Sequence, residues 1–242
     1  MEHFILAAGK SSRIFDKIKI NKCLIKINKF SLIKNIVFAS AKFNINKIKV
    51  VTGFKQHLIK KHLNNKKIKF IYNKYYNSRD MMYSFYLALK ESHQDILITY
   101  SDIYYSPSVI GKLISEKKND AIYVPILKNW KKIWEIRNKL EKNDAEELQI
   151  DKNDYITKIG QSTTKNNLPE FQFMGIVYIP KELKKKVISQ YLKLSKNKKL
   201  QTTHFLNYLI KNKIKVKSIK IKNKWYEFDD YEDLYNFRKL KW

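Results

Sequence analysis

Short apolar runs alternate with amphipathic segments along the first 115 residues of the chain. Four runs have the length and the apolar or β-branched content of buried strands, at 4–8, 47–52, 67–72 and 95–100. Segments with apolar residues at helical spacing follow them, at 32–42, 56–63, 81–91 and from 106 onward. This alternation predicts an α/β fold, in which helices flank a mostly parallel central sheet on both faces.

The second half of the chain contains the same elements in a less regular order. Strands are predicted at 120–127, 155–159, 171–179 and 214–221. Helices are predicted at 181–195, 203–211 and 230–238, and Asp230 is placed to cap the last of them. Since no repeat and no linker-like segment interrupts the pattern, we expect one domain over residues 1–242.

Small and polar residues follow the predicted strands of the first half at the points where those strands end. They are Gly9, Gly53, Asn73, Ser101 and Asp102. The carboxyl ends of parallel strands meet at one edge of a sheet, and the ligands of such sheets bind beyond that edge. We therefore expect these residues to lie close together around a binding site.

The chain is strongly basic, with a formal net charge of +28. Such a charge is compatible with a nucleic-acid-binding protein, because clustered Lys and Arg bind a phosphate backbone. However, only four residues are Arg, and the lysines occur in every segment beside many Ile, Asn and Tyr, as AT-rich codons would produce. We therefore expect no nucleic-acid partner, and non-catalytic nucleic-acid binding remains an alternative.

Two features bear on the cellular environment. The single cysteine, Cys23, excludes a disulfide framework. No apolar stretch approaches the roughly 20 residues that span a bilayer, and the N-terminus lacks the basic segment of a signal peptide. These features predict a cytoplasmic protein without membrane insertion. They leave the oligomeric state open, with a homodimer among the options.

The first predicted strand runs directly into the sequence Ala-Ala-Gly-Lys-Ser-Ser-Arg at 7–13. Small residues let a ligand approach the backbone, and a turn before a helix directs free N–H groups at an anion. Arg13 can then bind a phosphate through two hydrogen bonds. The spacing matches neither a Walker A loop nor a dinucleotide-binding loop, and the plainer alternative is an ordinary β-turn.

Together with Lys22, this loop resembles the N-terminal motif of the nucleotidyltransferases with a GT-A-like fold. The chain has Asn21 where proline is usual, and serines where many members have a second glycine. The resemblance implies a Rossmann-like fold, a nucleoside triphosphate substrate and catalytic roles for Lys22 and Arg13. It also implies nucleotide contacts from the loop residues, which are Leu6, Ala7, Ala8, Gly9, Lys10, Ser11, Ser12 and Arg13.

Two aspartates match the metal ligands of that family. Asp102 follows the fourth strand in Tyr-Ser-Asp-Ile, and Asp229 lies in a Trp-Tyr-Glu-Phe-Asp segment that resembles the family's C-terminal motif. Mg²⁺ in such sites usually binds one or two carboxylates together with substrate phosphates. The resemblance therefore implies a Mg²⁺ cofactor on Asp102 and Asp229. The plainer alternatives are a strand-end turn for the first residue and a helix cap near the second.

The segment after the third strand resembles the subgroup that acts on phosphocholine-like substrates. It reads Asn-Ser-Arg-Asp-Met-Met-Tyr-Ser at 77–84, with Asp80 where asparagine is usual. The resemblance implies that Asp80 and Ser84 contact the nucleotide or the acceptor, and we group them with Ser101 among the nucleotide-binding residues. Met81 and Met82 are expected to pack in the core.

Three more segments resemble one branch of the cytidylyltransferases: Trp-x-x-x-Trp-x-x-Arg at 130–137, Asp-Ala-Glu at 144–146 and Gln-Phe-Met-Gly at 172–175. They imply an acceptor site with aromatic faces and acids for an ammonium group, an arginine for a phosphoryl group and a glycine for close approach. The alternative is a helix buried by its tryptophans and a solvated turn. The implied acceptor-binding residues are Trp130, Trp134, Arg137, Asp144, Glu146 and Gly175.

The matches extend from Leu6 to Leu234, and the resemblance implies a metal-dependent cytidylyltransferase. CTP would donate CMP to a phosphocholine-, aminoethylphosphonate- or phosphoglutamine-like acceptor, with release of pyrophosphate, in the biosynthesis of a cell-surface polysaccharide or a phosphonate. Residues 1–115 would bind the nucleotide and residues 116–242 the acceptor. The alternative enzyme is a sugar-1-phosphate nucleotidylyltransferase, which would use the same loop, lysine and metal.

Overall fold

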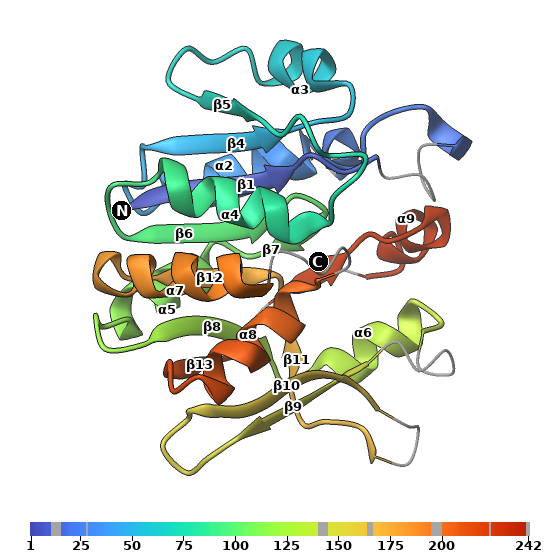
Figure 1. Ribbon diagram of the computed structural model, residues 1–242. Coiled ribbons are helices and arrows are strands. Elements are labelled where there is room, and N and C mark those ends of the chain that lie inside the picture. Colours follow the sequence, from blue (N-terminus) through green and yellow to red (C-terminus); the bar gives the residue numbers. More distant parts are fainter. Residues whose placement is uncertain are drawn as a thin grey trace.

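A computed structural model describes residues 1–10, 16–27, 29–139, 145–163, 167–194, 200–222 and 224–240. Its centre is an eight-stranded mixed sheet in the order β11-β8-β12-β6-β1-β4-β5, with β13 paired to β8 (Figure 1). The predicted α/β fold is therefore confirmed. The strands of this sheet are β1 (Glu2–Ala7), β4 (Ile48–Thr52), β5 (Lys69–Tyr72), β6 (Ile96–Tyr100), β8 (Ile122–Leu127), β11 (Gln172–Phe173), β12 (Ile176–Ile179) and β13 (Val216–Ile221).

The four strands of the first half are parallel neighbours, as their alternation with helices predicts. β1 pairs with β4 on one side and with β6 on the other, and β5 extends the sheet beyond β4. Every residue of β1 is buried. Strands that are covered on both faces are nearly continuous apolar runs in the sequence, which is why the hydrophobic pattern locates them.

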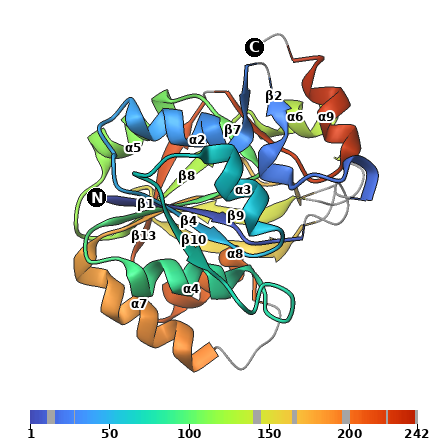
Figure 2. The same ribbon diagram turned by 90° about the horizontal axis from the view of Figure 1, so that it is seen from above.

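Helices cover both faces of the sheet (Figures 1 and 2). Alternate residues of β1 serve the two layers, with Phe4 in the core that includes Phe85 and Phe205, and Ile5 in the core that includes Leu32. One face carries α4 (Met81–Glu91), α7 (Lys181–Leu194) and α8 (Thr202–Lys211), and the other carries α2 (Leu32–Ala41), α3 (Gln56–Leu63) and α5 (Ser108–Glu116).

The second half departs from the predicted pattern at two strands. The run 171–179 forms β11 and β12 rather than one strand, because Gly175 between them takes a left-handed φ of 72°. The strand predicted at 155–159 is β10 (Ile156–Ser162), which pairs with β9 (Glu146–Ile150) outside the main sheet. β9 begins at Glu146, the last residue of the Asp-Ala-Glu motif, and the sequence pattern does not predict it as a strand.

Two short antiparallel pairs were not predicted. β2 (Lys26–Ile27) pairs with β3 (Phe30–Ser31), and β7 (Ile103–Tyr105) pairs with β14 (Trp225–Glu227). The second pair brings the C-terminal segment beside the residues that follow β6, with Glu227 opposite Ile103. Strands of two or three residues are too short to give a detectable period, and the partners β7 and β14 also lie far apart in the sequence.

Two helices begin at side-chain caps, of which the one at Asp230 is predicted from the sequence. Ser31 accepts a hydrogen bond from the backbone N–H of Lys34 at the start of α2. Asp230 forms a reciprocal capping box with Asp233 at the start of α9 (Tyr231–Phe237). The short helix α6 (Trp130–Ile136) carries the first tryptophan motif.

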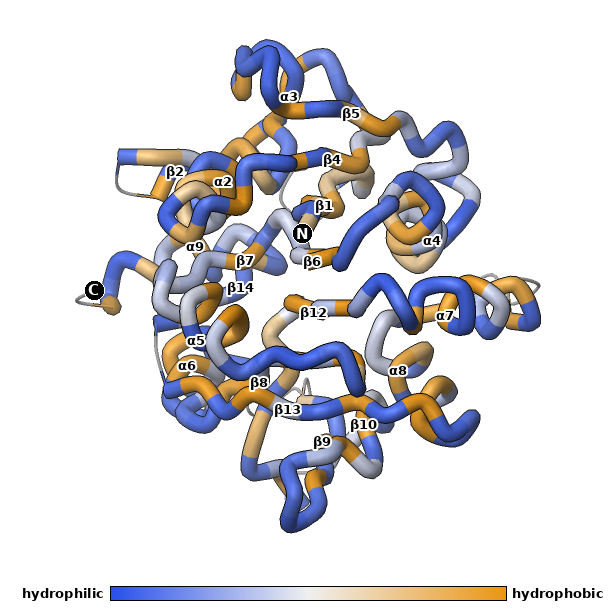
Figure 3. Tube along the Cα trace, turned by 90° about the vertical axis from the view of Figure 1, so that its left-hand side faces the viewer, coloured by the Kyte–Doolittle hydropathy of each residue, from blue (hydrophilic) through white to orange (hydrophobic). Residues whose placement is uncertain are grey.

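Hydrophilic residues dominate the peripheral segments around α3 and β9 (Figure 3). Within the described part of the chain, no helix combines the length and the apolar character needed to cross a bilayer.

Candidate functional site

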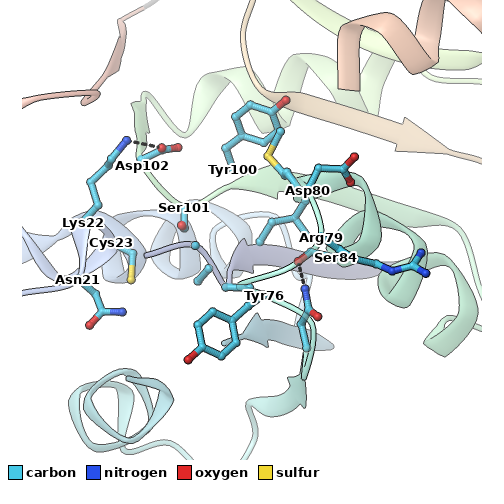
Figure 4. A pocket seen from close by; sticks show the side chains of 16 residues that line it. Asn21, Lys22, Cys23, Tyr76, Arg79, Asp80, Ser84, Tyr100, Ser101 and Asp102 are labelled. Carbon is cyan, nitrogen blue, oxygen red and sulfur yellow. Dashed lines mark hydrogen bonds and ion pairs between the residues drawn. The ribbon is translucent and has the colours of Figure 1, made fainter. Parts of the chain in front are cut away.

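The carboxyl ends of the parallel strands surround a cavity, here called the first cavity (Figure 4). Most residues that the sequence predicts at this edge of the sheet do line it. Asn73 donates a hydrogen bond from Nδ2 to Ser84 Oγ over 2.9 Å, which ties the end of β5 to α4. The lining residues predicted from the sequence are Leu6, Ala7, Ala8, Gly9, Lys22, Asn73, Asp80, Ser84, Ser101 and Asp102.

Two glycines shape this edge in different ways. A Cβ atom on Gly53 would lie 2.5 Å from the carbonyl oxygen of Ala8, so glycine is needed where the end of β4 meets the loop after β1. A Cβ atom on Gly9 would meet no atom of the described residues within 4 Å. Those residues therefore leave room for a ligand to approach the backbone at Gly9 closely.

Lys22 lies at the junction of the N-terminal and C-terminal segments. Its Nζ is 2.9 Å from Asp102 Oδ2 and 3.5 Å from Asp229 Oδ1. The preceding residue, Asn21, fixes the backbone locally by donating from Nδ2 to the carbonyl of Phe54 over 2.9 Å. The side chain of Lys22 is 11% exposed, so these ion pairs form in a partly desolvated environment.

The pairing of β7 with β14 assembles a carboxylate cluster, defined here as Asp102, Glu227 and Asp229. One oxygen from each of the three carboxylates lies within 4.8 Å of the others. The backbone N–H of Phe228 also donates to the carbonyl of Asp102 over 3.0 Å, which holds the two segments in register. Carboxylate oxygens at this spacing are the ligands that hard divalent cations prefer.

Two cations hold the cluster together with Asp233 in the described part of the chain. Lys22 pairs with Asp102 and Asp229, and Arg137 pairs with Glu227, Asp229 and Asp233.

The surroundings raise the pKa of both Lys22 and Glu227, for different reasons. Burial would lower the pKa of Lys22, but the carboxylates of Asp102 and Asp229 outweigh it and raise that pKa. Burial raises the pKa of Glu227 well above its ordinary value, and the charge of Asp229 adds to this rise against the opposing effect of Arg137. Burial and the neighbouring carboxylates therefore both favour the protonated form of Glu227.

A second cavity of about 380 Å³ adjoins the cluster from the side of the C-terminal half. Lys22, Met81, Tyr100 and Asp102 line both cavities, so the two meet at the Lys22–Asp102 ion pair. The other residues that line the second cavity are Trp134, Glu146, Gln172, Phe173, Gly175, Gln201, Thr203, Trp225, Glu227 and Asp229.

Residues 3–155 match the family model of the MobA-like NTP transferase domain. The chain belongs to this family. It is also 32% identical to the CTP:phosphoglutamine cytidylyltransferase of Campylobacter jejuni, over 97% of this chain and 98% of that protein. The family membership makes the two adjoining cavities the candidate active site of a nucleotidyltransferase.

Solved structures of nucleotidyltransferases share the fold of this family member. The inositol-1-phosphate CTP transferase of T. maritima has a TM-score of 0.77 at 21% identity, covering 96% of this chain and 90% of that one. The CTP:phosphocholine cytidylyltransferase of Streptococcus pneumoniae has a TM-score of 0.75 at 17% identity, covering 98% and 97%. At these identities the likeness extends to the fold alone.

Some predicted site residues of this NTP transferase lie elsewhere. Trp130 is fully buried and donates from Nε1 to the carbonyl of Pro169, so it packs the interior instead of lining either cavity. Arg137 is fully buried behind Asp229, and Lys10 is exposed and lines neither cavity. Ser11, Ser12, Arg13 and Asp144 lie outside the described residues.

Other lining residues were not predicted from the sequence. Tyr100 ends β6, and the sequence pattern predicts it only as a strand residue, yet it lines both cavities. Met81, expected in the core, also lines both cavities and is 37% exposed. Met82 is fully buried, as predicted. The position of Tyr100 directly before Ser101 is the signal that could have marked it. Gln201 and Thr203 reach the second cavity from the start of α8, and no local motif identifies them.

The two glycines beside the cavities give a paired prediction. A Cβ atom on Gly175 would lie 2.8 Å from the ring of Tyr100, and its φ of 72° disfavours any side chain. Gly175→Ala is therefore expected to lower the free energy of unfolding by about 1–3 kcal/mol. Gly9→Ala is expected to change it by less than about 0.5 kcal/mol while raising the KM for the nucleotide. Urea denaturation and initial rates measure both effects, and equal destabilisation by the two variants would contradict the prediction.

Proposed function

We propose that this NTP transferase is a cytidylyltransferase that transfers CMP from CTP to a small phosphorylated or phosphonate acceptor and releases pyrophosphate. The observation that carries the proposal is the meeting of two cavities at Lys22 and Asp102. A transfer between two substrates needs both reacting groups at one point, with opposite charge ready for the phosphates. The match to the Campylobacter jejuni enzyme favours CTP as donor and a phosphoglutamine-like acceptor.

The proposal assigns the first cavity to the nucleotide and the second to the acceptor. Residues 1–115 then form the nucleotide-binding half, and residues 116–242 supply most of the acceptor wall. The loop after β1 offers backbone N–H groups to the triphosphate, with Arg13 as its side-chain ligand. Asp80 and Ser84 would face the nucleoside from the start of α4, and Ser101 from the end of β6.

In the proposed reaction, a phosphoryl or phosphonate oxygen of the acceptor attacks the α-phosphorus of CTP. A new P–O bond forms, the bond between the α-phosphorus and its bridging oxygen to the β-phosphorus breaks, and pyrophosphate leaves with the electron pair. Lys22 donates hydrogen bonds from Nζ to the α-phosphate oxygens as negative charge concentrates there. Asp102 and Asp229 would hold Mg²⁺, which when bound offsets the charge of the reacting phosphates.

The walls of the second cavity suit a small acceptor with a nitrogen group. Trp134 stacks on Trp225 with ring centroids 5.8 Å apart, which presents an aromatic surface beside the carboxylate cluster. Glu146 accepts a hydrogen bond from Thr203 Oγ1 over 3.1 Å on another part of the wall. An aromatic surface and a carboxylate together favour an amine or an amide over an additional anion.

The experiment that tests the proposal is a pyrophosphate-release assay with Mg²⁺, CTP, UTP, ATP and GTP. Each nucleotide is paired with phosphoglutamine, phosphocholine, aminoethylphosphonate and glucose-1-phosphate. We expect CTP with a nitrogen-bearing acceptor to give a rate at least about 100-fold above the other nucleotides. Release with glucose-1-phosphate and UTP alone would assign the chain to the sugar nucleotidylyltransferases and overturn the proposal.

A further inference from the structure

Arg137 occupies a position that substrate cannot reach. It follows α6, its side chain is fully buried, and Trp134 and Tyr226 lie beside its guanidinium at 4.8 Å and 5.7 Å from their ring centroids. Its ion-pair partners are Glu227, Asp229 and Asp233 of the C-terminal segment, and the first two also line the second cavity, whereas Arg137 does not. Because Arg137 is buried and pairs with these acids, it can orient side chains of the protein but cannot contact a substrate.

The contacts of Arg137 divide the two oxygens of Asp229 between two tasks. Arg137 donates from an η nitrogen to Asp229 Oδ2 over 2.8 Å. The other oxygen, Oδ1, lies 3.5 Å from Lys22 Nζ, and the same Nζ lies 2.9 Å from Asp102 Oδ2 of the carboxylate cluster. Because one oxygen is held from behind, the carboxylate can present the other in a single orientation.

Asp233 completes this support from α9. It is fully buried and accepts from the ε nitrogen of Arg137 over 2.9 Å. Its other oxygen accepts from the backbone N–H of Asp229 over 2.6 Å and from that of Asp230 over 3.1 Å. The backbone and the side chain of Asp229 are therefore both fixed, the first by Asp233 and the second by Arg137.

We infer that Arg137 and Asp233 form a positioning pair that sets the cation affinity of the carboxylate cluster. This inference assigns Arg137 a role other than the acceptor contact expected from its motif, and it rests on the metal site of the proposed function. Arg137 also lies 3.8 Å from Glu227 Oε2, so one guanidinium reaches two members of the cluster. A planar fork that holds two carboxylates at once is a geometry that lysine does not reproduce.

The inference is tested by the binding of Mn²⁺ to the full chain without nucleotide, measured by the electron paramagnetic resonance of the free ion. Arg137→Lys keeps the charge and loses the fork, and we expect its Kd for Mn²⁺ to rise about 10- to 100-fold. The double variant R137M/D233N removes both buried charges and keeps an oxygen for the backbone N–H groups of Asp229 and Asp230. It is expected to weaken Mn²⁺ binding to the same extent.

A matched control lies at the opposite end of β1. Glu2 pairs with Lys49 over 3.0 Å and accepts from Ser92 Oγ over 2.7 Å, so Glu2→Gln also breaks a mostly buried ion pair. It should lower the urea midpoint as the Arg137 variants do, and leave the Kd for Mn²⁺ within about twofold of the wild type. If the lower stability of a variant is what weakens its Mn²⁺ binding, Glu2→Gln should weaken the binding as much as the Arg137 variants do. That result would overturn the inference.

The remaining outcomes separate the inference from the proposed function. Wild-type Mn²⁺ affinity in Arg137→Lys and in R137M/D233N overturns the inference, as does a rise in acceptor KM with unchanged Mn²⁺ binding. Failure of the wild-type chain to bind Mn²⁺ overturns both the metal site and the positioning pair. A third outcome has three parts: the wild-type chain binds Mn²⁺, the variants bind it more weakly, and no nucleotide is turned over. In that case the inference stands and the proposed function fails.

Discussion

Asp102→Asn is expected to reduce cytidylyl transfer by at least about 10³-fold while the protein stays folded. Asp102 lines both cavities and contributes to the carboxylate cluster, so its charge lies where the two substrates meet. The substitution keeps the shape of the side chain, and Lys22 retains Asp229 as a partner at 3.5 Å. Initial rates of pyrophosphate release and the midpoint of urea unfolding measure the two effects.

The matched control for this variant is Asp95→Asn. Asp95 immediately precedes β6, whereas Asp102 lies just beyond the other end of that strand. The carboxylate of Asp95 accepts a hydrogen bond from Tyr178 Oη over 2.8 Å, at the end of β6 away from the cluster. We expect Asp95→Asn to keep the transfer rate within about threefold and to lose stability instead. If Asp102→Asn turns over as fast as the wild type at the same Mg²⁺ concentration, Asp102 is not a metal ligand.

Lys22→Met is expected to change catalysis and cation binding in opposite directions. The ammonium group pairs with Asp102 and Asp229, so it stabilises them when no metal is bound and competes with a cation for them. Its removal should cut the transfer rate by about 10³-fold, because the α-phosphate loses its hydrogen-bond donor. The Kd for Mn²⁺ in the absence of nucleotide should fall below that of the wild type, since a competing charge is gone.

Lys139→Met controls for the loss of a mostly buried lysine near the cluster. Lys139 pairs with Asp230, which is not a member of the cluster, and its side chain is 7% exposed. It should leave the rate and the Mn²⁺ affinity nearly unchanged. A Lys22→Met variant that binds Mn²⁺ more weakly than the wild type would show that the lysine supports the metal site rather than competing for it.

The first half of the fold and its cavity could be read from the sequence because they depend on local patterns. Buried parallel strands give apolar runs, and each run ends at the edge where Gly9, Asn73, Ser101 and Asp102 gather. Alternation of strand and helix then fixes the order of the layers. This part required no knowledge of which distant segments pair.

The C-terminal contribution depends on a pairing that no local pattern reveals. β7 and β14 have three residues each and are separated by more than a hundred positions, yet they place Glu227 and Asp229 beside Asp102. The resemblance identified Asp229 through its motif, but it gave no geometry. The motif around Arg137 shows the limit of such transfer, because a charged residue in a matching segment lies behind the site rather than in it.

The most direct test of cytidylyl transfer is the ³¹P spectrum of the product formed from CTP and the preferred acceptor. If the α-phosphorus of CTP is joined to the acceptor, the product keeps both the α-phosphorus and the acceptor phosphorus in one molecule, linked through oxygen, and free pyrophosphate appears in equal amount. The two phosphorus nuclei then give coupled signals. A spectrum with CDP and inorganic phosphate, or with CMP and an unchanged acceptor, would contradict transfer and show hydrolysis instead.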